Sequence, residues 1–491
     1  MPTPIALYLT ILGALLAAGV MVSRTSARFG IPLLLAFLAI GILAGENGVG
    51  HISFSNYQLG FDIGVTALVL ILFDGGFNTP APRIRAAVLP SILLATVGVA
   101  VSAILVGLFV HLLFPFNWTE SLLVGSIVSS TDSAAVFSIL GHAGIQLKKR
   151  VGLILELESG LNDPMAVLLV SILTRSLAEN KRIEILPAAL AIASALSIGV
   201  IVGAIVGWTG TKLMRISRPP ATALLPVLSM AVAFLAFGTT TLISGSGFVA
   251  VYVCGVILGN AEIPYRSGIR RVHDSVTWLA QLLMFTLLGL LLTPVSAVQM
   301  ALPGLAVALL SILVARPVLA FICLLPLRLK LSEILYVGLV GLRGATPIIL
   351  AIYPVVARVR HGQEIFDLIF LAVVVNAFFP GMAVGYLTGK LGIGSEEATR
   401  PPAILEMLSN RILKGGEFLA FTIEHASAAA GALVRDIPMP PESSILFVIR
   451  NDRVIPPRGN LMLNPGDHVY ILCTREDDSF VRLVFGVEEP E

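Results

Sequence analysis

An apolar run at residues 151–173 contains the stretch Glu158-Ser159-Gly160-Leu161-Asn162-Asp163-Pro164. About 20 apolar residues suffice to cross a bilayer, and a charged carboxylate at its centre costs about 2.5–3.5 kcal/mol or more. Glu158 and Asp163 are therefore candidates for function. They lie five positions apart, about 500° of helix, so their side chains point about 140° apart. This geometry predicts two separate roles, of which one can be structural.

The composition is that of a membrane protein. Hydrophobic residues make up 56% of the 491-residue chain and charged residues 13%, whereas soluble domains carry about 25% charged residues. Apolar runs recur along the chain, and they predict an all-α polytopic membrane protein with about 13 transmembrane helices. The short runs that begin at residues 31 and 248 could be broken or tilted. The runs cover residues 4–23, 31–44, 63–77, 86–113, 122–140, 151–173, 187–210, 221–242, 248–259, 276–292, 302–327, 334–357 and 365–387.

Several classes of function receive no support from the sequence. A net charge of +2 argues against a nucleic-acid partner. Cys254, Cys323 and Cys473 are scattered, and neither they nor the seven histidines have the spacing of a disulfide framework or a metal site. We expect no cofactor, no metal beyond a transported monovalent cation, and no enzymatic activity. The first run lacks a preceding basic segment, so it is predicted to be a retained span rather than a cleaved signal.

Loop charges predict the orientation. Basic residues concentrate in alternate loops, which places the N-terminus outside and the C-terminus in the cytoplasm. The predicted cytoplasmic loops hold Arg24, Arg28, Arg83, Arg85, Lys148, Lys149, Arg150, Lys212, Arg215, Arg218, Arg266, Arg270, Arg271, Arg328 and Lys330, whereas the opposite loops hold only Lys181, Arg182, Arg358 and Arg360.

Two of the apolar runs are interrupted by polar and helix-breaking residues. The fifth contains Ser129-Ser130-Thr131-Asp132-Ser133, and the twelfth contains Gly341-Leu342-Arg343-Gly344-Ala345-Thr346-Pro347. Hydroxyl side chains compete for backbone hydrogen bonds, and unwound backbone is tolerated at membrane depth where it lines a cavity. We therefore expect two discontinuous helices. They are seven runs apart, as are the sixth and thirteenth runs, which predicts an inverted repeat with a site between its halves.

The expected site combines these elements. Asp163, Asp132, Asn162, Thr131 and Ser159 could together supply the oxygen ligands that suit a hard monovalent cation. Arg343 is predicted to form a structural ion pair with Glu158. Arg316 in the eleventh run is the rival partner and is also a possible residue of the ion pathway. Asp74, which ends the third run, either faces the pathway or marks an interface. Asn376 in the last run is predicted to bond another helix rather than a ligand.

The motifs Thr131-Asp132, Glu158-x-x-x-Asn162-Asp163 and Gly341-Leu342-Arg343-Gly344 together resemble the monovalent cation:proton antiporters of the NhaP type. The resemblance covers about residues 5–391. It implies two crossed discontinuous helices, Asp163 as the essential carboxylate that binds cation or proton, Asn162 in place of the second aspartate of electrogenic relatives, and a Glu158–Arg343 ion pair. It also implies a homodimer in a bacterial inner membrane.

Polar residues return after residue 394, which predicts a transmembrane domain at 1–394, a linker at 395–415 and a small cytoplasmic α+β domain at 416–491. Strands are expected at 444–450, 453–456 and 468–474. This tail resembles the C-terminal lobe of regulator-of-potassium-conductance domains (TrkA-C type), through Arg435-Asp436-Ile437-Pro438 and Leu463-Asn464-Pro465-Gly466-Asp467 among other motifs. The resemblance implies dimerisation and a small-molecule or nucleotide ligand. The whole chain looks most like bacterial potassium/proton antiporters that control cell volume.

The predicted mechanism is exchange of K⁺, or alternatively Na⁺, for H⁺ by alternating access. Burial favours the protonated form of a carboxyl group and a bound cation favours the ionised form, so one site at Asp163 can hold either. One titrating charge per cation predicts electroneutral exchange. Two rival classes are an intramembrane aspartic protease, whose Gly-x-Gly-Asp signature is absent, and a gated K⁺ channel, whose Thr-Val-Gly-Tyr-Gly filter is absent.

Overall fold

The chain forms two compact units, residues Met1–Ser395 and Glu396–Glu491. The structure, a computed structural model, describes residues 4–29, 33–46, 48–52, 54–79, 87–142, 145–217, 222–292, 299–344, 346–394, 417–424, 427–450, 453–474 and 477–486. The predicted linker at 395–415 lies outside these residues.

The first unit is mainly helical in its described residues. Each predicted apolar run coincides with one helix or with consecutive helices. By length and composition, five of the described helices could each cross a membrane, or six if the bent pair within α19 counts as one span, so the total of 13 spans stays a prediction. The helices are α1 (Pro4–Phe29), α2 (Leu33–Ala44), α3 (Tyr57–Asn78), α5 (Val88–Leu93), η1 (Leu94–Gly98), α6 (Val99–Leu113), α7 (Trp118–Val128), α8 (Ser133–His142), α9 (Lys149–Glu179), α10 (Ile185–Ile216), α11 (Leu224–Leu242), α12 (Gly247–Gly259), α13 (Arg266–Leu290), α15 (Ala301–Leu310), η2 (Ser311–Ala315), α16 (Arg316–Leu324), η3 (Leu325–Leu327), α17 (Leu331–Leu339), α18 (Thr346–Val356) and α19 (Gly362–Lys390).

The predicted repeat is visible in the order of these helices. A helix with a π-helical turn (η1), a broken helix (α7 and α8) and a long helix (α9) follow one another. The same order recurs as the π-helical η2, the broken pair α17 and α18, and the long α19. Matching interruptions in two halves are what an inverted repeat requires.

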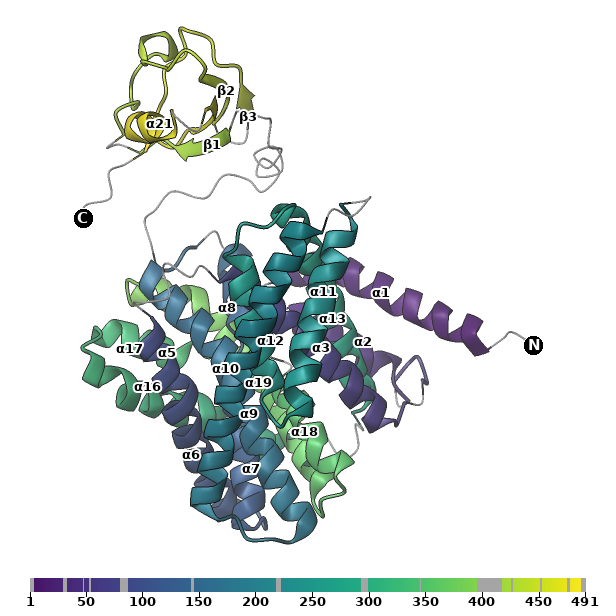
Figure 1. Ribbon diagram of the computed structural model, residues 1–491. Coiled ribbons are helices and arrows are strands. Elements are labelled where there is room, and N and C mark those ends of the chain that lie inside the picture. The colour runs from purple at the N-terminus through teal and green to yellow at the C-terminus, as the bar shows by residue number, and fades with distance from the viewer. Residues whose placement is uncertain are drawn as a thin grey trace. The chain divides into compact units, whose positions relative to one another are not determined.

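The helices pack as two groups. We call α1–α3 and α10–α13 the scaffold bundle, and α5–α9 and α15–α19 with their π turns the crossing bundle, because contacts within each group are more extensive than contacts between them. Figure 1 shows α5, α16 and α17 on one side of the unit and α2, α3 and α11 on the other. The bundles meet mainly where α18 contacts α3 and where α9 contacts α12 and α3.

The second unit is a small α+β domain, as predicted. Its strands β1 (Glu417–Thr422), β2 (Ser444–Arg450), β3 (Arg453–Ile455) and β4 (His468–Cys473) form an antiparallel sheet in the order β1-β4-β2-β3. The helix α21 (Asp478–Phe485) packs its buried Val481 and Phe485 against the sheet core, which includes Val448 and Val469. Three of the strands lie where the sequence places them, whereas β1 and α21 are additions to the prediction.

One ion pair secures the hairpin region of this domain. Arg450 Nε and Nη2 donate to the two carboxylate oxygens of Asp467, each at 2.7 Å. The pair raises the pKa of the Arg450 guanidinium, with the hydrogen bond to Asp467 as its largest cause. Asp467 Oδ2 also accepts the backbone N–H of Asn464 at 2.8 Å. Gly466 has φ +92°, a conformation that favours glycine, so the turn before Asp467 depends on a glycine at this position.

Candidate functional site

The two broken helices cross at their interruptions. Residues 129–132 separate α7 from α8, and the described residues 340–344 after α17 are not helical before α18 begins at Thr346. The backbone N–H of Asp132 donates to the carbonyl oxygen of Leu342 at 2.8 Å, which joins one break to the other. The predicted break at Ser130–Asp132 and the crossing of two discontinuous helices are both confirmed.

Local chemistry explains the first break. Ser126 donates its hydroxyl to the carbonyl of Leu122, and Ser129 donates to the carbonyl of Ser126 at 2.6 Å. Such bonds compete with the helical ladder. Asp132 then starts the next helix, because its Oδ1 accepts the N–H of Ala135 at 3.2 Å in the manner of an N-cap.

Charged side chains complement the helix ends that meet at the crossing. Arg343 Nη1 donates to the carbonyl oxygen of Ser130, just beyond the C-terminal end of α7, at 2.8 Å. Its Nη2 donates to Ser311 Oγ, in the π-helical turn η2, at 2.5 Å. Asp132 sits at the N-terminal end of α8. A cation at a helix C-terminus and an anion at an N-terminus are both favourable, so these two residues stabilise the unwound backbone.

Asp163 lies beside this crossing. It is buried, at 7% exposure, on the long helix α9. Its Oδ1 accepts a short hydrogen bond from the hydroxyl of Ser130, and its Oδ2 accepts one from Thr346 at 2.9 Å. One donor comes from the break after α7 and the other from the first residue of α18. The carboxylate is therefore bound by both broken helices.

The other predicted ligands divide into two groups. Ser159 accepts the N–H of Ser133 at 3.2 Å and donates to the carbonyl of Thr131 at 3.0 Å, and it lines the cavity described below. Asn162 donates from Nδ2 to the hydroxyl of Thr131 at 2.6 Å, and neither of these two side chains lines that cavity. The sequence predicts both as cation ligands; in the structure they bind each other.

The structure corrects the predicted ion pair. Glu158 forms a two-bonded salt bridge with Arg316: Nη1 bonds Oε1, and Nη2 bonds Oε2 at 2.9 Å. Arg343 instead binds Ser130 and Ser311. Arg316 directly follows η2, and a π-helical turn changes the face on which later side chains lie. The predicted Glu158–Arg343 pair is therefore wrong, and Arg316, also considered for the pathway, is the structural partner.

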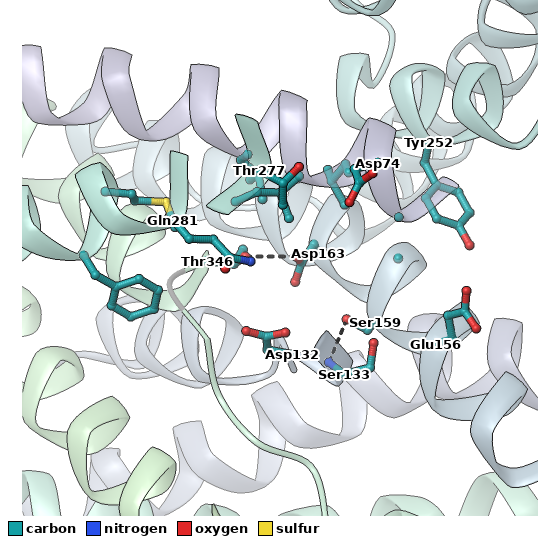
Figure 2. Close-up of a pocket in the computed structure, with 17 residues that line it drawn as sticks. Asp74, Asp132, Ser133, Glu156, Ser159, Asp163, Tyr252, Thr277, Gln281 and Thr346 are labelled. Carbon is teal, nitrogen blue, oxygen red and sulfur yellow. Dashed lines mark hydrogen bonds between the residues drawn. The ribbon is translucent and has the colours of Figure 1, made fainter. Parts of the chain in front are cut away.

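A cavity of about 140 Å³ opens between the two bundles beside Asp163 (Figure 2). The predicted residues Asp74, Asp132, Ser159 and Asp163 all line it. Asp74 therefore lies at the cavity, where the two bundles face each other. Other polar lining residues are Ser133, Glu156, Tyr252, Thr277, Gln281 and Thr346.

Some of these residues could have been found from the sequence. Glu156 precedes Asp163 by seven positions, which puts both on the same face of a helix. Ser130 and Thr346 belong to the two interrupted motifs. Tyr252 and Gln281 come from apolar runs far away in the chain, where no local pattern marks them.

The crossing predicts the effect of a substitution at Gly344. A Cβ atom there would lie 2.3 Å from Asp132 Oδ2 and 2.7 Å from its Cβ. Gly344→Ala is expected to push the two breaks apart, to cost about 1–3 kcal/mol of stability and to lower cation/proton exchange. Exchange in membrane vesicles and the apparent Tm of the purified protein measure both effects. Gly238→Ala on α11 is the matched control, because a Cβ atom built there has no neighbouring atom within 4 Å. Equal exchange and equal Tm in the two variants would contradict the close approach of Gly344 to Asp132.

Comparison with known proteins agrees with this geometry. A family described as "Sodium/hydrogen exchanger, transmembrane" matches residues 11–390, and the TrkA-C domain matches residues 418–484. The chain is 37% identical over 477 residues to the "K(+)/H(+) antiporter NhaP" of Alkalimonas amylolytica, which covers 96% of this chain and 82% of the relative. It is 38% identical over 469 residues to the "K(+)/H(+) antiporter NhaP2" of Shewanella oneidensis, with 94% and 80% covered.

A solved structure has the same fold. The sodium proton antiporter MjNhaP1 of Methanocaldococcus jannaschii superposes with a TM-score of 0.67 at 21% identity, over 77% of this chain and all of that one. The exchanger family covers most of the chain, including both broken helices and Asp163. This protein therefore belongs to the transmembrane sodium/hydrogen exchanger family, as a multi-pass membrane transporter with a C-terminal TrkA-C domain.

Proposed function

We propose that this protein exchanges K⁺ for H⁺ across the bacterial inner membrane and that cation and proton compete for Asp163. The observation that carries the proposal is a buried carboxylate that lines a cavity and is bound by both broken helices. Relatives 37–38% identical over most of this chain are named K(+)/H(+) antiporters. Family membership favours a carrier over the channel and protease alternatives.

The environment of Asp163 suits this competition. An ionised carboxylate without a partner is costly in a dry interior, so the carrier can move only when a proton or a cation neutralises it. Ser130 and Thr346 donate hydrogen bonds that stabilise the ionised form. When the carboxyl group is protonated, one of these hydroxyls can rotate to accept a bond instead. One carboxylate and one monovalent cation then give electroneutral exchange.

Oxygen atoms at the cavity supply the rest of the cation site. Asp163, Asp132 and Ser159 line the cavity, and Thr346 adds a hydroxyl. In this proposal the hydrogen bond between Asn162 and Thr131 holds the unwound backbone in place beside the cation site. Asp74 contributes a further carboxylate from the scaffold bundle.

A vesicle assay distinguishes K⁺ from Na⁺. Everted membrane vesicles that carry the protein are acidified, and the recovery of a quenched pH dye is followed after K⁺ or Na⁺ is added. We expect the larger response, with the lower KM, for K⁺. An equal or larger response to Na⁺ would replace the proposal by Na⁺/H⁺ exchange, and a substrate-dependent current across a planar membrane would contradict electroneutrality.

The setting of the transporter is also proposed. The loop charges support an outer N-terminus and a cytoplasmic C-terminal domain. Resemblance to the NhaP type supports a homodimer. The TrkA-C domain supports regulation of exchange by a small molecule or nucleotide bound in the cytoplasm.

A further inference from the structure

Glu156 is a second carboxylate on the cavity wall of α9. It precedes Asp163 by seven residues, about 700° of helix, so both side chains share one face and lie about 10.5 Å apart along the axis. Both line the cavity. Figure 2 shows Ser159, on the same helix, between the two carboxylates. A cation that moves along this face from the Lys149 end of α9 reaches Glu156 first.

Four acidic side chains line the cavity. Asp74, Asp132, Glu156 and Asp163 all contribute carboxylates, and the described lining residues include no Lys, Arg or His. Glu158, two residues further along α9, differs because Arg316 neutralises it. A low-dielectric cleft lined by one sign of charge raises the local concentration of the opposite ion. The charge on Glu156 is thus placed to act on the ion rather than on the fold.

One polar side chain from the scaffold bundle reaches Glu156. Thr79, which is 1% exposed just after α3, has its hydroxyl 3.2 Å from Glu156 Oε1. The same hydroxyl lies 2.7 Å from the carbonyl of Gly75 and 3.3 Å from the hydroxyl of Tyr252. It has one proton for two acceptors, so its bond to the carboxylate is weak and easily exchanged. Thr79 can orient Glu156 without preventing it from contacting a cation.

We propose that Glu156 is a further residue of the cation path, which draws the cation into the cavity ahead of Asp163, and that Thr79 is its positioning residue. This inference rests on the proposed exchange at Asp163. It assigns the two carboxylates of one helix face different tasks: Glu156 sets how readily the cation enters, and Asp163 exchanges it for a proton.

The test is the K⁺ dependence of exchange in everted vesicles that contain the full chain. Glu156→Gln keeps the size and an oxygen acceptor but removes the charge. A unit charge about 10.5 Å from the site predicts a KM for K⁺ about two- to tenfold higher, with kcat unchanged. Glu156→Asp keeps the charge and should restore a KM close to that of the unaltered protein.

Thr79→Val should also raise the KM for K⁺, by less than Glu156→Gln does. Thr79→Ser keeps the hydroxyl and should leave the KM close to that of the unaltered protein. Glu179→Gln, at the exposed far end of α9, is the matched control and should leave KM unchanged. An unchanged KM in Glu156→Gln, or a loss of kcat at unchanged KM, would overturn the inference. If Asp163→Asn retains exchange, the proposed function fails; if it abolishes exchange while Glu156→Gln keeps the normal KM, only this inference fails.

Discussion

Asp163→Asn is expected to reduce cation/proton exchange to the background of vesicles without the protein. Asparagine has nearly the same shape as aspartate. Its amide can still form hydrogen bonds with Ser130 and Thr346, the two residues that donate to Asp163 in the unaltered protein. The asparagine amide cannot take up a proton or neutralise a cation, so the variant can transport neither the proton nor the cation. The loss should therefore appear in kcat for K⁺ and Na⁺ alike, while the variant remains folded in the membrane.

The measurement is dye recovery in everted vesicles at several K⁺ concentrations, with protein quantity checked by immunoblot and size-exclusion chromatography. Asp62→Asn provides the matched control, because Asp62 is an exposed carboxylate on α3 that bonds Gln58 and does not line the cavity. Its exchange should stay normal. Exchange retained by Asp163→Asn, or lost equally in both variants, would contradict the assignment of the site to Asp163.

The broken helices could be predicted because their causes are local. The run of hydroxyl residues before Asp132 competes for backbone bonds within one turn, and glycine and proline interrupt the twelfth run within a few positions. The inverted repeat could be predicted because the two interrupted apolar runs are seven runs apart. The strands of the C-terminal domain were similarly predictable from alternation, except β1, which pairs with β4 about 50 residues away.

The partner of Glu158 could not be found in this way. Arg316 and Arg343 are both predicted to lie in the middle of apolar runs, and regular helical counting does not separate them. The π-helical turn at 311–315 changes the face of Arg316, and no feature of the sequence announces that turn. The cavity lining could not be predicted from local sequence either. Asp74, Tyr252 and Gln281 line it from helices whose positions depend on packing between the bundles.

The correction separates the two arginines by task. Arg316 neutralises a buried acid, whereas Arg343 bonds the backbone of Ser130 and the hydroxyl of Ser311. The first contact secures α9 to α16 within the crossing bundle. The second secures the break that carries Ser130, a direct donor to Asp163. Removal of either arginine should affect exchange, but only Arg316 should be strongly coupled to Glu158.

A double-mutant cycle on the purified full chain tests this distinction. Arg316→Met leaves Glu158, which is 1% exposed, as a buried and unpaired charge, so a loss of about 3–5 kcal/mol of stability is expected, with a lower apparent Tm and yield. Glu158→Gln combined with Arg316→Met removes both charges and should recover much of that loss. The coupling energy between positions 158 and 316 should exceed that between 158 and 343, measured with Arg343→Met in the same detergent. A larger coupling to 343 would restore the pairing that the sequence alone predicted, and with it the view that Arg316 belongs to the pathway.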